Sequence, residues 1–264
     1  MKIKNVLLTG GHSGMGLELS KILINEGHKI GLILRSETRK QDAIEALGNP
    51  SNIDFFFADL GKRDQIQRVA EEIKSTWSNI DVLFNNAGVL LDKLYYSDYG
   101  NELQLEINAI SPFLLTKELL PLLEKSENPL VVSTATSGLQ KRELVNISQL
   151  KKPTKFTKLT GPYMDSKLVM VLLMNYLSDK NGKVRVVSVD PGAIKTKMTA
   201  GDGMPFWLKP IRNLLFKSPK QGAENLYDGA FNEKNRGSGI YLSDGKIKKM
   251  KASLNDQQVN ELLK

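Results

Sequence analysis

The sequence predicts an α/β fold: a doubly wound, mostly parallel sheet of seven strands with helices on both faces. Two observations predict it. Short β-branched runs alternate with helical patterns from the N-terminus onward, and this rhythm is typical of right-handed βαβ units. The 264 residues also contain no internal repeat and no linker, so we expect one domain over residues 1–264.

The elements follow one another in a regular order. We expect strands at Ile3–Leu8, Lys29–Leu34, Ile53–Phe57, Ile80–Phe84, Leu130–Thr134, Val184–Val189 and Gly239–Leu242. We expect helices at Met15–Asn25, Thr38–Leu47, Arg63–Trp77, about 99–123, from Pro162 onward, and Lys220–Phe231. Proline suits the first turn of a helix, because its missing N–H has no partner there in any case.

Two segments interrupt the rhythm. Residues 139–160 form a polar, lysine-rich insertion, and residues 197–218 carry methionines, leucines and aromatic residues among glycines and prolines. Long irregular loops in a compact fold often carry function. We therefore expect a substrate-loop insertion near 139–160 and a lid over the substrate near 197–218. Burial of this segment in an oligomer interface and its contact with a membrane surface are the two alternatives.

Composition limits the function classes. The chain has no cysteine and two histidines, which excludes disulfides and thiol catalysis and leaves no basis for a metal site. The net charge is +8, and an anionic cofactor accounts for it without nucleic acid. No apolar run approaches the roughly 20 residues of a membrane span. We expect a cytoplasmic protein without an integral membrane segment.

A glycine-rich turn follows the first strand. Gly10, Gly14 and Gly16 lie between an apolar strand and a helix, the arrangement of a Rossmann turn that holds a dinucleotide pyrophosphate on backbone N–H groups. The loop residues between these glycines are His12, Ser13 and Met15. The His12 side chain either approaches the cofactor or occupies a variable position of the loop.

The end of the second strand selects the cofactor. Dinucleotide sites for NAD usually place a carboxylate there, whereas an arginine accommodates the 2′-phosphate of NADP. The strand ends in Leu34-Arg35-Ser36, with no acidic residue from Lys29 to Ser36. We expect Arg35 to favour NADP(H) over NAD(H) by about ten- to hundredfold, because a charge-assisted contact is worth roughly 1.5–3 kcal/mol.

Tyr163 and Lys167 are one helical turn apart, so a phenol and an ammonium share one face of a helix. A held dinucleotide and an activated tyrosine together indicate hydride transfer with proton relay. We expect the Lys167 ammonium to lower the pKa of Tyr163 from its usual value near 10. Tyr163 would then be the general acid in reduction and the general base in oxidation.

Over nearly its whole length the chain resembles the short-chain dehydrogenase/reductase family. The resemblance implies an adenine contact at Asp59 and Leu60, and cofactor contacts in Asn85-Asn86-Ala87-Gly88, where Asn85, Ala87 and Gly88 are the expected residues. It implies that Asn108 organises the proton relay. It also implies contacts to the nicotinamide from the segment Asp190–Thr196, at Pro191, Gly192, Ile194 and Thr196.

Within the family, the chain is similar to the retinol dehydrogenase and WW-domain oxidoreductase branch. Leu34-Arg35, the run Pro-Phe-Leu-Leu-Thr after Asn108, and the insertion before the tyrosine carry this likeness. The resemblance also implies homodimers or homotetramers. The substrate class is a carbonyl or alcohol, lipophilic if residues 197–218 cover it. The alternative is a cofactor-binding regulatory protein of the same fold with little activity.

The family places a serine at the end of the fifth strand, and this chain departs from that pattern. The segment reads Ser133-Thr134-Ala135-Thr136-Ser137, and the serine position falls on Ala135 or on Thr136, depending on where the count begins. Ser133 and Ser137 share a face with Ala135, whereas Thr134 and Thr136 share the other. We favour Thr136 as the hydroxyl that orients the substrate oxygen.

Overall fold

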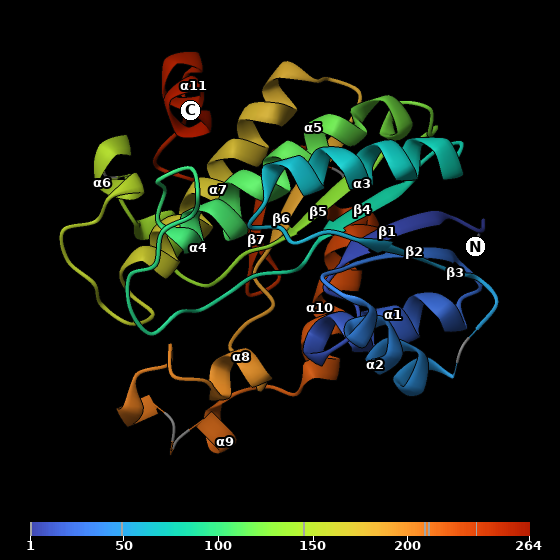
Figure 1. Cartoon of the computed structure of the whole chain (residues 1–264), viewed down its shortest axis with the longest axis horizontal. Coiled ribbons are helices and arrows are strands. Elements are labelled where there is room, and N and C mark those ends of the chain that lie inside the picture. The colour runs from blue at the N-terminus through green and yellow to red at the C-terminus, as the bar shows by residue number, and fades with distance from the viewer. Residues whose placement is uncertain (1, 49, 145, 209, 211, 236) are drawn as a thin grey trace.

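The computed structural model describes residues 2–48, 50–144, 146–208, 210, 212–235 and 237–264. Its sheet has the strand order β3-β2-β1-β4-β5-β6-β7-β8 (Figure 1). The strands are β1 Asn5–Thr9, β2 Lys29–Leu34, β3 Ile53–Phe57, β4 Val82–Asn85, β5 Leu130–Thr134, β6 Arg185–Val189, β7 Ile240–Ser243 and β8 Lys246–Lys248. β1 to β7 pair in parallel. The predicted doubly wound α/β class is confirmed.

The prediction of seven strands was wrong by one. β8 pairs antiparallel with β7 through the register Ser243↔Lys246. Asp244 and Gly245 form the turn, with φ angles of 53° and 67°, and such positive angles match the two-residue hairpin turn that Asp-Gly favours. The lysines of β8 look like a charge run in the sequence, whereas the Asp-Gly pair is the signal that predicts a hairpin.

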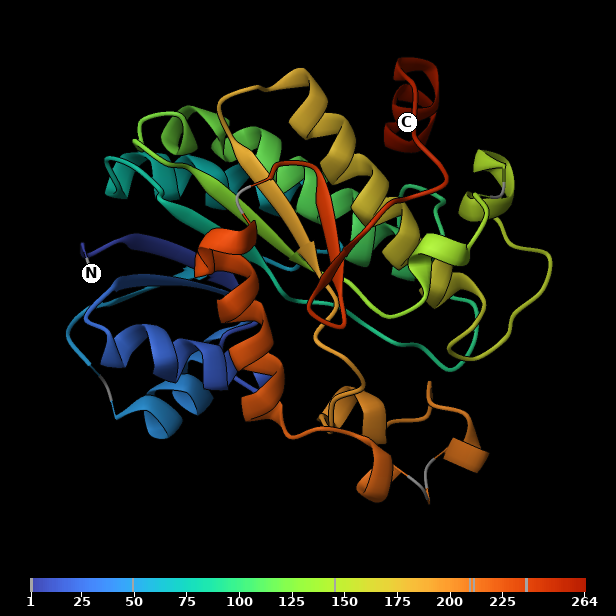
Figure 2. The ribbon, with the colours of Figure 1, turned by 180° about the vertical axis from the view of Figure 1, so that it is seen from behind.

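Helices cover both faces of the sheet (Figures 1 and 2). The α-helices are α1 Gly14–Asn25, α2 Glu37–Leu47, α3 Arg63–Thr76, α4 Leu103–Leu105, α5 Ser111–Leu123, α6 Ile147–Lys151, α7 Pro162–Lys180, α8 Lys197–Ala200, α9 Arg212–Leu215, α10 Pro219–Phe231 and α11 Asp256–Leu263. Three 3₁₀ turns occur at η2 Leu139–Lys141, η3 Phe206–Leu208 and η4 Glu233–Asn235.

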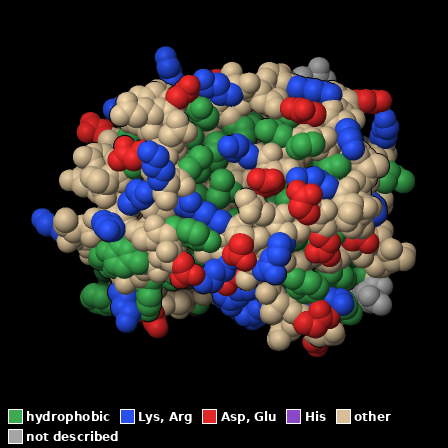
Figure 3. All heavy atoms as spheres, turned by 45° about the horizontal axis from the view of Figure 1, so that its top comes forward, with side chains coloured by type: hydrophobic (Ala, Val, Ile, Leu, Met, Phe, Trp, Pro, Cys, Tyr) green, Lys and Arg blue, Asp and Glu red, His purple; other side chains and the backbone are tan. Residues whose placement is uncertain are grey.

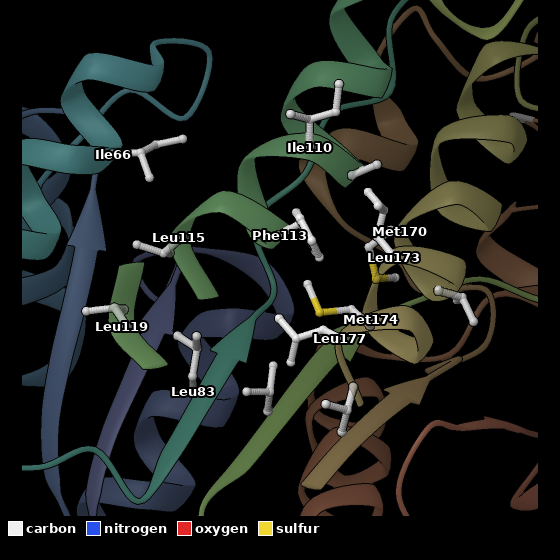
Figure 4. Close-up of a cluster of buried hydrophobic side chains, with 14 of the residues drawn as sticks. Ile66, Leu83, Ile110, Phe113, Leu115, Leu119, Met170, Leu173, Met174 and Leu177 are labelled. Atoms are coloured by element: carbon white, nitrogen blue, oxygen red, sulfur yellow. The ribbon is translucent and has the colours of Figure 1, made fainter. Parts of the chain in front are cut away.

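Two hydrophobic cores hold these layers together. α3, α5 and α7 pack on one face, where Leu83 of β4 meets Phe113 of α5 and Met174 of α7 (Figure 4). α1 and α10 pack on the other face over Phe84 and Val132. Successive strand residues point to opposite faces, so the apolar runs of β4 and β5 supply both cores. Burial on both faces explains why these strands are continuously apolar.

The expected helix over about 99–123 is interrupted. The helix begins at Leu103, passes through a π-helical turn, η1 Glu106–Ile110, and continues as α5. π-helical turns are rare and often mark functional sites, and this one contains Asn108. Buried Glu106 accepts hydrogen bonds from Arg63 at 2.7 Å and Asn101 at 2.7 Å, which anchors the turn from two sides.

The two irregular segments contain short helices. Residues 139–160 include η2 and α6, and residues 197–218 include α8, η3 and α9. The latter residues, called the lid segment below, leave and rejoin the body at one place. The Lys217 N–H donates to the Ala193 carbonyl at 2.8 Å, and the Lys195 N–H donates to the Lys217 carbonyl at 2.9 Å.

Within the described part of the chain, no helix combines the length and apolar character needed to cross a bilayer.

Candidate active site

A cavity of about 470 Å³ lies at the carboxyl ends of β1, β4, β5 and β6. Ligands of open α/β sheets bind at this edge, at the point between β1 and β4 from which the strand order runs outward in opposite directions. The cavity brings together sequence-predicted residues from five segments: Gly10, His12, Ser13, Gly14, Met15, Gly16, Ala87, Gly88, Thr136, Tyr163, Lys167, Pro191, Gly192, Ile194 and Thr196.

The glycine turn is held by close backbone packing. A Cβ atom on Gly16 would lie 2.3 Å from the Gly10 carbonyl oxygen, and Gly10 has a φ of +72°. Side chains are therefore excluded at both positions. Ser13, the N-cap of α1, makes no side-chain capping bond, and the first turn of α1 contains no acidic residue. The N–H groups of the first turn of α1 and the positive end of its dipole are thus available to the cavity, as an anion site requires.

Thr9 and Asn86 connect the turn to the segment after β4. The Thr9 hydroxyl accepts from the Asn86 N–H at 3.0 Å and the Ala87 N–H at 2.9 Å, while the Asn86 amide donates to the Thr9 carbonyl at 3.0 Å. The sequence analysis selected Asn85, but its amide turns away and donates to Thr116 of α5 at 3.0 Å. Strand alternation sends Asn85 into the helix layer, so Asn86 lines the cavity instead.

Three basic residues surround His12. Burial is the largest cause that lowers the pKa of His12. The nearby charges of Arg39, Lys197 and Arg35 lower it further, whereas the charge of Asp42 raises it. Arg35 is exposed at the end of β2 and does not line the cavity. The sequence pattern singles out Arg35, which lies between β2 and α2, but not Arg39 in the first turn of α2 or Lys197 on the distant lid segment. Arg39 pairs with Asp42 at 2.9 Å, which offsets part of the positive charge that the three residues place beside the glycine turn.

The predicted adenine contacts lie outside the cavity lining. The Asp59 carboxylate accepts from the Gly61 N–H at 2.9 Å, and the Leu60 carbonyl accepts from the Ser111 hydroxyl. Both residues follow β3 at the same edge of the sheet. Their contact with a cofactor stays a prediction.

Lys167 is buried and directed at the end of β5. Its ammonium donates to the Thr134 carbonyl at 2.7 Å, and burial lowers its pKa to about 8. A Cβ on Gly88 would lie 3.4 Å from Lys167 Nζ and 3.0 Å from Asn108 Oδ1. The Gly88 backbone therefore lies against both groups.

Asn108 fixes the π-helical turn to the cavity wall. Its amide donates to the Val89 carbonyl at 2.9 Å and to the Ser166 hydroxyl at 3.0 Å, and its oxygen accepts from the Val89 N–H at 2.8 Å. The side chain is buried and its hydrogen-bonding groups are in use. Asn108 can thus hold the loop after β4 against α7, on which Tyr163 and Lys167 lie.

The pKa of the Tyr163 phenol is raised, whereas the sequence analysis expects Lys167 to lower it. Burial raises its pKa to about 12, although a side-chain hydrogen bond with Thr136 acts in the opposite direction. Lys167 is not among the groups that shift the pKa of Tyr163, and burial is the one cause that shifts the pKa of Lys167 itself. At neutral pH the phenol is therefore protonated, as a proton donor for reduction must be.

The hydroxyls after β5 occupy different environments. Thr136 is half-buried and contacts the Tyr163 phenol, while Ser137 is exposed. The Ser133 hydroxyl is fully buried without a hydrogen-bond partner among the described residues. Ala135 is buried. Because β5 ends at Thr134, strand alternation does not extend to Thr136. Of these hydroxyls, that of Thr136 is the one beside the phenol.

The segment after β6 closes the cavity opposite the glycine turn. Asp190 accepts from the Gly192 N–H at 2.8 Å and from the Ser243 hydroxyl at 2.8 Å. Thr196 caps α8, and its side chain would lie 3.4 Å from a Cβ on Gly14. Two separate loops are thus brought into near contact at one place on the cavity wall.

The lid segment supplies an apolar wall. Met204 packs against Tyr163 and Leu90, and Met198, Leu208 and Phe216 pack around them. A Cβ on Gly203 would lie 2.4 Å from the Leu90 carbonyl oxygen, so the lid segment touches the loop after β4 directly. The sequence pattern indicated the lid segment, but nothing in the residues around Leu90 indicates that Leu90 packs against it.

Comparison with known proteins identifies relatives. Residues 4–203 match the family described as short chain dehydrogenase. The chain is 26% identical to the polyprenol dehydrogenase of Danio rerio, covering 98% of this chain and 84% of that protein. It is 27% identical to retinol dehydrogenase 14 of Homo sapiens, covering 97% and 82%. The predicted likeness to the retinol dehydrogenase branch is confirmed.

Solved structures share the fold. Salutaridine reductase from Papaver somniferum aligns with a TM-score of 0.72 at 22% identity, over 91% of this chain and 99% of that one. The NADPH-bound carbonyl reductase from chicken fatty liver aligns with a TM-score of 0.73 at 18% identity, over 94% and 99%. A 3-ketoacyl-(acyl-carrier-protein) reductase from Brucella melitensis, complexed with NADH, aligns with a TM-score of 0.69 at 20% identity, over 92% and 97%.

Proposed function

We propose that this chain, which belongs to the short-chain dehydrogenase family, is an NADP(H)-dependent oxidoreductase acting on a lipophilic carbonyl or alcohol. One observation carries the proposal. Tyr163 and Lys167 line the same cavity as the glycine turn, at the carboxyl edge of the sheet. An acid–base group and a dinucleotide site in one cavity are the components that hydride transfer requires.

The residues present fit a dinucleotide. The turn at Gly10 and Gly16 leaves no room for side chains, so phosphates can approach the backbone at the start of α1. His12 Nδ1 is buried without a partner among the described residues. Arg35, Arg39 and Lys197 around His12 support preference for NADP(H), because the 2′-phosphate adds negative charge.

The chain's own residues perform the proton chemistry. When bound, the nicotinamide supplies or accepts a hydride at C4. In reduction, Tyr163 donates its phenolic proton to the carbonyl oxygen, and Thr136 orients that oxygen by a hydrogen bond. Lys167 lies one helical turn away, and its ammonium, which donates to the Thr134 carbonyl at the end of β5, would hold the nicotinamide ribose by a hydrogen bond. In oxidation, Tyr163 must first lose its phenolic proton, and the resulting phenolate then takes the proton from the alcohol.

Apolar side chains define the substrate class. Leu90, Leu159, Met164, Met198 and Phe216 line the cavity near Tyr163. Apolar walls with few polar groups favour substrates that lose apolar surface on binding. A carbonyl or hydroxyl group on an alkyl or polyene chain would meet Thr136 and Tyr163 at its polar end.

Replacement of Tyr163 by phenylalanine tests the function. We expect turnover of NADPH with medium- and long-chain aldehydes to fall about 10²- to 10⁴-fold, while calorimetry shows unchanged NADPH affinity. Tyr176→Phe, the same chemical change further along α7, should keep full activity. Equal turnover of Tyr163→Phe and the unaltered protein would contradict the proposal and favour the regulatory alternative.

A further inference from the structure

The lid segment, residues 197–218, is apolar on two sides. Its inner side, with Met204 and Phe216, packs over Tyr163. Its outer side exposes Phe206 at 83%, Trp207 at 60%, Leu214 at 84% and Leu215 at 62%. A segment that only covered a cavity would need one apolar side, because the other would meet water. The outer side therefore needs a separate explanation.

The exposed apolar side chains are concentrated on this segment. Among the described residues, Phe206 and Leu214 are the most exposed large hydrophobic side chains, and two neighbours accompany them. α8 and α9 lie below the helix layers and away from the sheet (Figures 1 and 2). Large exposed apolar side chains gathered on one segment often mark an interaction site in soluble proteins.

The charged residues of the stretch that carries this surface are mostly basic. The stretch 195–220 contains six lysines and arginines and one acidic residue, Asp202. Lys197 is exposed at the start of α8, and Lys220 is exposed in the first turn of α10. Elsewhere, over α3, α5 and α7, basic and acidic side chains are interspersed (Figure 3). The basic excess thus accompanies the apolar side chains.

Charge distinguishes the occupants of this surface. A second copy joined by a twofold axis would place the same patch opposite itself, which brings the lysines of both copies together. A bilayer with anionic headgroups accepts aromatic and leucine side chains at its boundary and attracts lysines at its surface. The apolar side chains then meet the bilayer boundary, and the lysines meet the anionic headgroups.

We propose that the outer side of the lid segment docks onto an anionic lipid bilayer, inserting Phe206, Trp207, Leu214 and Leu215 between headgroups that Lys220 contacts. Docking goes beyond the proposed function, since it requires no turnover. It places the lid segment between the bilayer and the cavity that contains Tyr163. An apolar substrate dissolved in the bilayer would then have a short path into the cavity.

Vesicle binding by the full chain, without cofactor, tests this proposal. The protein should float with phosphatidylcholine vesicles that contain phosphatidylserine and bind weakly to phosphatidylcholine alone, and added salt should release it. The double variant Phe206→Ser/Leu214→Ser should bind at least about tenfold more weakly, because each side chain contributes apolar burial. Ile3→Ser, at a residue 68% exposed near the N-terminus, should bind normally.

Tryptophan fluorescence locates the contact. Trp77 is buried, hydrogen-bonded to Asp54, whereas Trp207 is exposed, so a blue shift on adding vesicles reports Trp207. Trp207→Phe should abolish the shift and keep vesicle binding.

Equal binding by the unaltered protein and the double variant would overturn the proposal. Absence of binding to anionic vesicles, or self-association through the lid segment seen by gel filtration, would also overturn it. None of these results bears on turnover, so failure here leaves the proposed oxidoreductase activity intact.

Discussion

The glycine turn and the lid segment face each other across the same cavity and are built in opposite ways. Around Gly16 the backbone packs so closely that a methyl group would lie 2.3 Å from a carbonyl oxygen. On the lid segment, Phe206 and Leu214 are more than 80% exposed. The cofactor side thus depends on backbone geometry, and the substrate side depends on side chains. This difference allows one scaffold to keep its cofactor while substrates change.

The largest effect on stability should come from the buried ion pair at the π-helical turn, beneath the glycine-turn side of the cavity. Arg63→Ala leaves Glu106, whose side chain is fully buried, without its charge partner beside Asn108. Breaking a buried ion pair in this way costs about 3–5 kcal/mol of unfolding free energy. Urea denaturation measures it. Lys62→Ala, which removes an exposed pair with Asp98, should change stability by less than about 1 kcal/mol. Similar losses in the two variants would contradict the role of burial.

The turn itself should be intolerant of one added methyl group. Gly16→Ala should weaken NADPH binding by more than about tenfold, since the Gly10 carbonyl must shift away from the phosphate position. Calorimetric titration measures the affinity. Gly182→Ala is the matched control, because a Cβ there meets nothing within 4 Å. Unchanged affinity in Gly16→Ala would show that the turn is less fixed than its packing indicates.

Alkaline pH should reveal the burial of Lys167. Its pKa is lowered by burial to about 8, so between pH 8 and about 10.5 the unfolded chain binds more protons than the folded one, and stability rises with pH through that window. Relative to Lys167→Met, the unaltered protein should gain on the order of 1–3 kcal/mol between pH 7 and about pH 10. Urea denaturation across this range measures the gain, and a pH-independent difference would contradict the burial of the charge.

The smallest effect should come from the outer side of the lid segment. Phe206→Ser removes a side chain that is 83% exposed, so stability should change by less than about 0.5 kcal/mol. Thermal denaturation in the absence of lipid measures it. A loss above about 2 kcal/mol would mean that Phe206 packs against the body in solution, and the contrast with the glycine turn would disappear.

The sequence predicted what depends on local pattern. The approximate strand positions, the glycine turn and the helix starting at Pro162 follow from periodicity and turn residues, and they are present. Three features escaped because they depend on tertiary packing. Asn86 rather than Asn85 lines the cavity because of strand register, Arg39 and Lys197 meet only in the fold, and the π-helical turn at Asn108 has no sequence signature. The eighth strand had a signal, Asp244-Gly245, that the lysine run obscured.

The pKa of Tyr163 teaches a similar lesson. Sequence spacing predicted that Lys167 lowers it, yet burial raises it to about 12. Spacing along a helix gives proximity, whereas the pKa also depends on desolvation, which only the packed structure determines. A positively charged oxidised nicotinamide beside the phenol would act against this burial, so cofactor binding and acid–base chemistry are coupled in the proposed mechanism.

The central claim is that this cavity binds NADP(H), and parallel calorimetric titration of the protein with NADPH and NADH tests it most directly. We predict that NADPH binds about ten- to hundredfold more tightly, because Arg35, Lys197 and the Asp42-paired Arg39 would place positive charge near the 2′-phosphate. Equal affinities would contradict the charge argument at the end of β2. Absence of binding by either dinucleotide would contradict the account as a whole.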